Sequence, residues 1–129
     1  MALPQHHKLT ILLLMRLMEV KSLLKPTECV FVVLDSNHTK QHVLGELSAY
    51  SEFVSIDSYI VACDGIMETL VGAPRSNDDW MWNNPKAAAE EFVKKNEKFV
   101  IEEPQFLFNE GSVTERVTYW PSAFLRRIK

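Results

Sequence analysis

Apolar residues dominate the start of the chain over Leu9–Leu24, where Arg16, Glu19 and Ser22 recur every three residues. On a helix this spacing leaves one narrow polar stripe on an otherwise apolar surface. The charged residues interrupt the segment before it reaches the ~20 apolar residues that a membrane span requires, and no small-residue cleavage site of a signal peptide follows it. The pattern therefore favours a buried helix, covered by the domain's own sheet or by another chain, over a signal peptide or membrane anchor.

Two apolar runs farther along the chain flank a helical pattern. Cys29–Leu34 and Ser58–Cys63 are rich in β-branched residues, and Lys40–Tyr50 between them places apolar residues on one face, with Thr39 as the expected N-cap. Because the first run is continuously apolar, it predicts a central strand buried on both faces. Strand, helix and strand in this length predict a right-handed βαβ unit in a mostly parallel sheet.

The second half of the sequence predicts a loop, a helix and further strands. The loop Val71–Asn84 carries two tryptophans and is long for a compact domain, which is typical of lids and binding loops. Asn84 is the expected cap of a helix that begins at Pro85. The remaining β-patterns, before a polar C-terminal end, are Phe99–Ile101, Gln105–Phe108 and Thr114–Trp120. An α/β fold follows from this order of elements.

Composition narrows the class of protein. A length of 129 residues fits one domain, in which we expect residues 1–25 to hold the apolar helix and residues 26–129 the α/β body. Lys and Arg number 14 against 17 Asp and Glu, for a net charge of −3, which excludes the cationic surface needed for binding nucleic acid. Cys29 and Cys63 allow at most one disulfide, so a reducing, cytoplasmic setting is expected.

Acidic residues follow both predicted strands of the βαβ unit. Asp35 ends the first run and Asp64 ends the second, and in open α/β sheets ligands bind beyond the carboxyl ends of the strands. Two neighbouring carboxylates suit Mg²⁺, which completes its shell with water or substrate. Asn37 and His38 lie on the same turn and offer a further ligand or a general base. The alternative interpretation is that both aspartates only form turns.

Other residues give weaker indications of chemistry. The sequence contains no glycine-rich loop of the kind that binds phosphates or dinucleotides, because its four glycines are scattered along the chain, at Gly45, Gly65, Gly72 and Gly111. Trp80 and Trp82 either stack on a substrate or anchor their own loop. Cys63 fits a buried small side chain better than a nucleophile, and His42 fits a solvated position on its helix.

Several motifs together resemble one known family. The stretch Val32–Thr39 (VVLDSNHT), followed by His42–Leu47 (HVLGEL) and Tyr50, resembles the cephalosporin hydroxylase family. Further similar positions are Ser58–Val61, Asp64, Asn83–Lys86, Ala89, Glu91, Phe92 and Phe124–Arg127. This family contains S-adenosylmethionine-dependent methyltransferases, including rhamnosyl O-methyltransferases. The resemblance implies a truncated Rossmann-like methyltransferase fold, with a mostly parallel sheet and a C-terminal antiparallel portion.

The resemblance also implies roles for individual residues. Asp35 matches a magnesium ligand, Asp64 falls at the acidic position that completes the metal site, and His38 would assist deprotonation of an acceptor hydroxyl. The implied cofactors are Mg²⁺ and S-adenosylmethionine, and the implied acceptor is a small molecule with a hydroxyl group. We assign four residues to the substrate or lid region: Trp80, Trp82, Asn83 and Asn84.

The chain also departs from the family pattern. The resemblance covers about the C-terminal half of the family fold, because the first strands and the glycine-containing loop for the methyl donor have no counterpart before the Asp35 strand. Cys63 stands where some members have a second acid. We therefore expect little binding of S-adenosylmethionine by this chain alone. Two hypotheses follow: a magnesium-assisted methyltransferase completed by a missing N-terminal half or by a homo-oligomer partner, and a non-catalytic remnant or self-associating interaction module.

Overall fold

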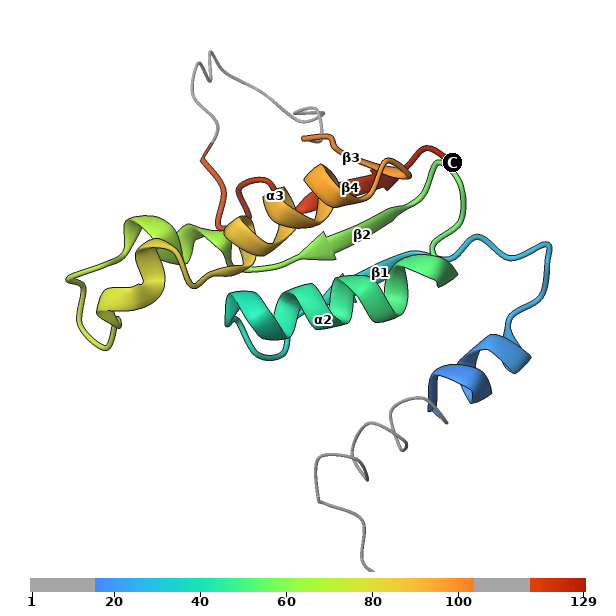
Figure 1. Cartoon of the computed structure of the whole chain (residues 1–129), viewed down its shortest axis with the longest axis horizontal. Coiled ribbons are helices and arrows are strands. Elements are labelled where there is room, and N and C mark those ends of the chain that lie inside the picture. Colours follow the sequence, from blue (N-terminus) through green and yellow to red (C-terminus); the bar gives the residue numbers. More distant parts are fainter. Residues whose placement is uncertain (1–15, 104–116) are drawn as a thin grey trace, which may run out of the picture.

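Four strands form one mixed sheet in the computed structural model, which describes residues 16–103 and 117–129 (Figure 1). They lie in the spatial order β1-β2-β4-β3 and are β1 (Val32–Leu34), β2 (Tyr59–Ala62), β3 (Phe99–Ile101) and β4 (Phe124–Arg127). β1 and β2 are parallel, whereas β4 runs antiparallel to both β2 and β3. The α/β class, the parallel βαβ pair and the antiparallel C-terminal portion are confirmed, and antiparallel pairs outnumber parallel ones among the described strands.

Two helices lie side by side over one face of this sheet, α2 (Lys40–Tyr50) and α3 (Pro85–Lys95) (Figure 1). The main core fills the space between helices and sheet, where Leu47, Ile60 and Leu125 are fully buried. Ile60 and Leu125 are direct partners across β2 and β4. Burial of an aliphatic side chain of this size contributes about 1.5–3 kcal/mol, so this layer fixes both helices on the sheet.

The two helix starts differ in how their free N–H groups are satisfied. Asn84 caps α3 as predicted, since its Oδ1 accepts the Ala87 N–H at 2.8 Å. Thr39 occupies the N-cap position of α2 as predicted, but its side chain makes no capping hydrogen bond. Instead, the Asn83 Oδ1 accepts the Lys40 N–H at 2.8 Å. The start of α2 is therefore tied to the residue that precedes the cap of α3.

β1 lies at an edge of the described sheet, which corrects the expectation of a central strand buried on both faces. Leu34 faces the core, but Val33 is 51% exposed and Phe31 is exposed as well. An unbroken apolar run is typical of a strand covered on both sides, and the described part of this chain covers only one side. The strand is also shorter than the predicted run Cys29–Leu34, because β1 begins at Val32.

β4 is a strand that the sequence pattern does not predict. Its arginines resembled a polar end, yet Arg126 is paired with Glu102 at 2.6 Å and with Asp57 at 2.9 Å, while Leu125, directly before the two arginines, enters the core. Conversely, the strand predicted at Thr114–Trp120 is wrong over residues 117–120, which have no strand structure. The remainder of that segment and the strand predicted at Gln105–Phe108 lie outside the described residues.

Residues 16–23 are helical and form the described part of the predicted apolar helix, which stands away from the sheet (Figure 1). Met18 and Leu23 are strongly exposed, so the sheet does not cover these residues. Lys21 connects the helix to the body through an ion pair with Glu52 at 3.2 Å. Across residues 16–103 and 117–129, no helix is long and apolar enough to cross a membrane. Coverage of the apolar helix by another chain stays a prediction.

Candidate metal and acceptor site

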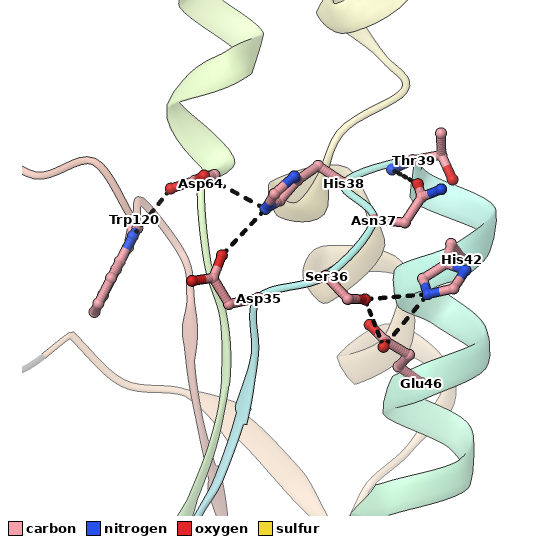
Figure 2. A network of polar contacts seen from close by, with 9 residues as sticks. All are labelled: Asp35, Ser36, Asn37, His38, Thr39, His42, Glu46, Asp64 and Trp120. Carbon is pink, nitrogen blue, oxygen red and sulfur yellow. Dashed lines mark hydrogen bonds and ion pairs between the residues drawn. The ribbon is translucent and has the colours of Figure 1, made fainter.

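The ends of two parallel strands bring three of the predicted site residues together. Asp35 directly follows β1, Asp64 follows β2 after one residue, and His38 lies on the loop between β1 and α2. The His38 Nε2 lies 3.4 Å from the Asp35 Oδ1 and 3.4 Å from the Asp64 Oδ2 (Figure 2). One possible ligand atom from each of the three residues falls within 4.8 Å of the others. The cluster thus forms at the edge where the strand directions place it.

This donor set suits a divalent cation. Two carboxylates and an imidazole nitrogen are ligands for Mg²⁺, Mn²⁺ and related ions, and atoms bound to one ion at about 2.1 Å lie roughly 3 Å apart when at right angles. The side chains of Asp35 and Asp64 are 63% and 45% exposed, which leaves room for water to complete a coordination shell. Within the described ranges neither aspartate pairs with a lysine or arginine, so a cation would meet uncompensated negative charge.

A cavity of about 510 Å³ opens beside the cluster. Its polar end is formed by Asn37, His38, Thr39 and Asp64, and its wall by Ile66, Met67, Leu70, Trp80 and Tyr119. The described residues that line it include no lysine or arginine. The shape and lining suit a molecule with an uncharged, largely apolar body that directs a polar group toward Asp64.

The other residues predicted for the substrate or lid region lie elsewhere. Trp82 is largely exposed and borders a different cavity, on the α2 side. The Asn83 Nδ2 donates to the Asp79 Oδ2 at 2.6 Å, in addition to its contact with the start of α2. Asn84 is fully buried, and its Nδ2 donates to the Trp80 carbonyl oxygen at 2.8 Å. The two asparagines therefore anchor the loop that carries Trp80, whereas Trp80 itself faces the cavity beside Asp64.

Trp120 belongs to the site although sequence reasoning did not single it out. Its Nε1–H donates to the Asp64 Oδ1 at 3.2 Å across 56 residues of sequence (Figure 2). No spacing rule connects the two positions, because their contact depends on the chain returning to the end of β2 just before β4. Only the aromatic character of Trp120 was visible as a signal.

A second polar cluster lies at the other side of the same loop. The Ser36 Oγ donates to the Glu46 Oε1 at 2.8 Å and lies 3.2 Å from the His42 Nε2 (Figure 2). The same Nε2 lies 3.3 Å from the Glu46 Oε1. In a serine–histidine–acid relay the acid binds the opposite ring nitrogen from the serine, so this cluster does not have that geometry. It fastens the loop after β1 to α2.

Cys63 lies between β2 and Asp64, and its thiol is buried. Burial, together with the negative charges of Asp35 and Asp64, raises the pKa of this thiol to about 11. At pH 8 roughly one Cys63 in a thousand is then a thiolate, the reactive form.

We therefore expect iodoacetamide to modify Cys29, which is exposed, and to spare Cys63 until the protein is unfolded. Intact-mass measurement at pH 8, with and without urea, checks this, and rapid double alkylation of the folded protein would contradict it.

Comparison with known proteins shows where this geometry belongs. A family model described as rhamnosyl O-methyltransferase/CmcI matches residues 15–128. The chain belongs to this family. The match confirms the resemblance to the cephalosporin hydroxylase family that the sequence motifs predict. The cluster of Asp35, His38 and Asp64 lies within the region that matches the family model. Searches with the chain gave no match to a curated protein or to a solved structure.

Proposed function

We propose that this chain supplies the metal-binding and acceptor-binding part of an O-methyltransferase that uses S-adenosylmethionine. The observation that carries the proposal is the cluster of Asp35, His38 and Asp64, located in the region that matches the O-methyltransferase family. The acceptor is a small molecule with a hydroxyl group, bound in the cavity beside Asp64. The two free cysteines fit the reducing cytoplasm as its location.

In this proposal each residue of the cluster has a separate role in the methyl-transfer reaction. Asp35 and Asp64 would hold Mg²⁺, and a divalent ion bound there would supply Lewis-acid chemistry that lowers the pKa of an acceptor hydroxyl. His38 lies beside both carboxylates and accepts the hydroxyl proton at its Nε2. Trp80 and Tyr119 orient the body of the acceptor, which limits the positions that its hydroxyl can take.

In this proposal the methyl donor binds outside residues 16–103 and 117–129. No glycine-rich turn follows β1 or β2 in these ranges, and the loop after β1 already carries the Asp35 cluster. We propose that residues 26–129 correspond to the C-terminal half of a Rossmann-like methyltransferase fold. A further polypeptide segment or a second copy of the chain would then hold S-adenosylmethionine.

Mn²⁺ titration of the purified chain tests the metal site. We expect weak binding, because only the two carboxylates contribute ligands and water fills the other positions. Asp35→Asn and Asp64→Asn each remove a full negative charge from the first shell. Each substitution should weaken Mn²⁺ binding by more than roughly 10–100-fold, which is the loss typical when the changed residue contacts a metal ligand and not the metal itself. Calorimetry, or the electron paramagnetic resonance signal of free Mn²⁺, gives the affinities.

Asp78→Asn is the matched control, because Asp78 is an exposed aspartate outside the cluster. It should leave Mn²⁺ affinity unchanged. Equal affinities in the wild type and the Asp35→Asn, Asp64→Asn double variant would remove the metal site. Micromolar binding of S-adenosylmethionine by the chain alone would show that the donor site is not elsewhere.

A second candidate function is a non-catalytic module that associates with itself or another chain. Exposed Val33 on the edge strand β1, exposed Phe31 directly before this strand and the exposed apolar helix at residues 16–23 favour it. This candidate requires no metal. A wild-type chain that binds no Mn²⁺ therefore favours the module over the methyltransferase.

A further inference from the structure

Three consecutive residues before β4 meet three consecutive residues of the turn after β2. The Trp120 indole donates to the Asp64 carboxylate at 3.2 Å, and the Ile66 N–H donates to the Tyr119 carbonyl at 3.1 Å. Between them, a Cβ on Gly65 would lie 2.8 Å from the Pro121 carbonyl oxygen. The backbone segments are therefore in close contact over their whole length, and Gly65 is the residue type that permits it.

The two carboxylate oxygens of Asp64 face different partners (Figure 2). The Oδ1 accepts the Trp120 N–H, and the Oδ2 lies 3.4 Å from the His38 Nε2. The backbone of Asp64 has a φ of 61°, a left-handed conformation that departs from the extended backbone of β2. A donor fixed on one oxygen leaves the side chain little freedom to rotate, so the other oxygen stays directed at the cluster.

Trp120 is itself held in place from two directions. Its ring packs against Phe124 of β4, with ring centroids 6.4 Å apart. Its backbone N–H donates to the Thr118 Oγ1 at 3.0 Å, and its carbonyl accepts the Ala123 N–H at 3.3 Å. The indole donor is thus attached to the sheet and does not depend on Asp64 for its position.

We infer that Trp120 is a positioning residue of the candidate metal site: its indole N–H fixes Asp64 so that the second carboxylate oxygen remains available to the cation. This inference rests on the proposed function, because it concerns the same site. Donors of this kind orient metal ligands, and their loss typically lowers metal affinity. The role differs from that of a residue that only fills the core, since it depends on one N–H group and one carboxylate oxygen.

Trp120→Phe tests the inference, because it keeps an aromatic ring against Phe124 and removes only the indole donor. Trp120 is 37% exposed, so we expect a loss of about 10-fold in Mn²⁺ affinity, the low end of the range typical of residues that orient metal ligands. The matched control is Tyr59→Phe, which removes an O–H that donates to the Glu102 carboxylate at 3.1 Å at the other end of β2. The control should leave Mn²⁺ affinity unchanged.

A double-variant comparison separates positioning from general destabilisation. In an Asp64→Asn background the carboxylate that Trp120 orients is gone, so adding Trp120→Phe should cause no further loss of Mn²⁺ affinity. Equal losses in both backgrounds would overturn the inference. Unchanged Mn²⁺ affinity in Trp120→Phe, with normal binding by the wild type, would overturn it as well while leaving the proposed function intact. Absence of Mn²⁺ binding by the wild type would remove the proposed function and this role together.

A measurement without metal keeps the inference testable if Trp120→Phe does not fold. The chain has three tryptophans, and their indole N–H groups give separate nuclear magnetic resonance signals that single tryptophan variants assign. Asp64→Asn should shift the Trp120 indole signal and leave that of Trp82 in place, since Trp82 has no contact with Asp64. An unmoved Trp120 signal would show that the hydrogen bond does not exist in solution.

Discussion

Ile60→Asp should abolish folding, whereas Val33→Asp should leave the protein folded. Ile60 is fully buried in the central strand β2, opposite Leu125 and beneath both helices. An unpaired carboxylate there costs several kcal/mol, a large fraction of the ~5–15 kcal/mol that stabilises a typical domain. Val33 occupies the edge strand β1 and is 51% exposed, so a carboxylate at this position remains in contact with water.

Far-ultraviolet circular dichroism and thermal melting distinguish the two variants. We expect no cooperative transition for Ile60→Asp and a melting curve close to the wild type for Val33→Asp, with a loss below about 1 kcal/mol. The pair is matched, because both variants replace a β-branched side chain by aspartate in neighbouring strands. A folded Ile60→Asp variant would contradict the position of β2 in the sheet, and an unfolded Val33→Asp variant would mean that this face is covered in solution.

Asn84→Ala should lower the free energy of unfolding by about 2–5 kcal/mol, although Asn84 is an uncharged residue in a loop. Its Oδ1 caps α3 at the Ala87 N–H, a contact worth about 1–2 kcal/mol. Its Nδ2 satisfies the Trp80 carbonyl, and loss of a buried partner costs about 1–3 kcal/mol more. Alanine supplies neither group.

Urea unfolding measures this loss as a lower midpoint with an unchanged slope. Asn77→Ala is the control, since Asn77 holds the N-cap position of the short 3-10 helix η3 (Asp78–Met81) without a side-chain hydrogen bond. That control should stay within about 0.5 kcal/mol of the wild type. Equal midpoints for Asn84→Ala and the wild type would contradict the buried capping role of Asn84.

Local signals were sufficient for much of the fold. The helix period predicted α2 with its observed bounds, and Asn84 followed by Pro85 predicted the start of α3. The apolar runs predicted β1 and β2 and their parallel pairing. These features depend on neighbouring residues in the sequence, where periodicity and capping preferences act.

Contacts between distant residues explain what the sequence did not predict. Arg126 is compatible with a position in β4 because Glu102 and Asp57 form ion pairs with its guanidinium group. The exposed face of β1 depends on the absence of a covering element in the described chain, and an apolar run carries no information about its neighbours. Periodicity describes one segment at a time, so it cannot show either effect.

The positions of the candidate site residues were also only partly predictable from the sequence. Asp35 and Asp64 were predictable as neighbours, because parallel strands end at the same edge of a sheet. Trp80 and Trp82 are only two residues apart, yet one lines the cavity beside Asp64 and the other borders a separate cavity. Their different directions are set by the turn of η3 and its anchors at Asn83 and Asn84, which a residue pattern does not specify.

The strand order β1-β2-β4-β3 has a consequence for the timing of folding during synthesis. β3 is made before β4 but pairs only with β4 among the described strands, and β4 also supplies the second neighbour of β2. A nascent chain that ends before Phe124 therefore leaves β2 and β3 with open edges, which are prone to pair with other chains. Trp120 and Pro121, which contact the turn at Asp64 and Gly65, also emerge from the ribosome late. We expect the βαβ unit to form early and the turn at Asp64 and Gly65 to become ordered only when translation has passed β4.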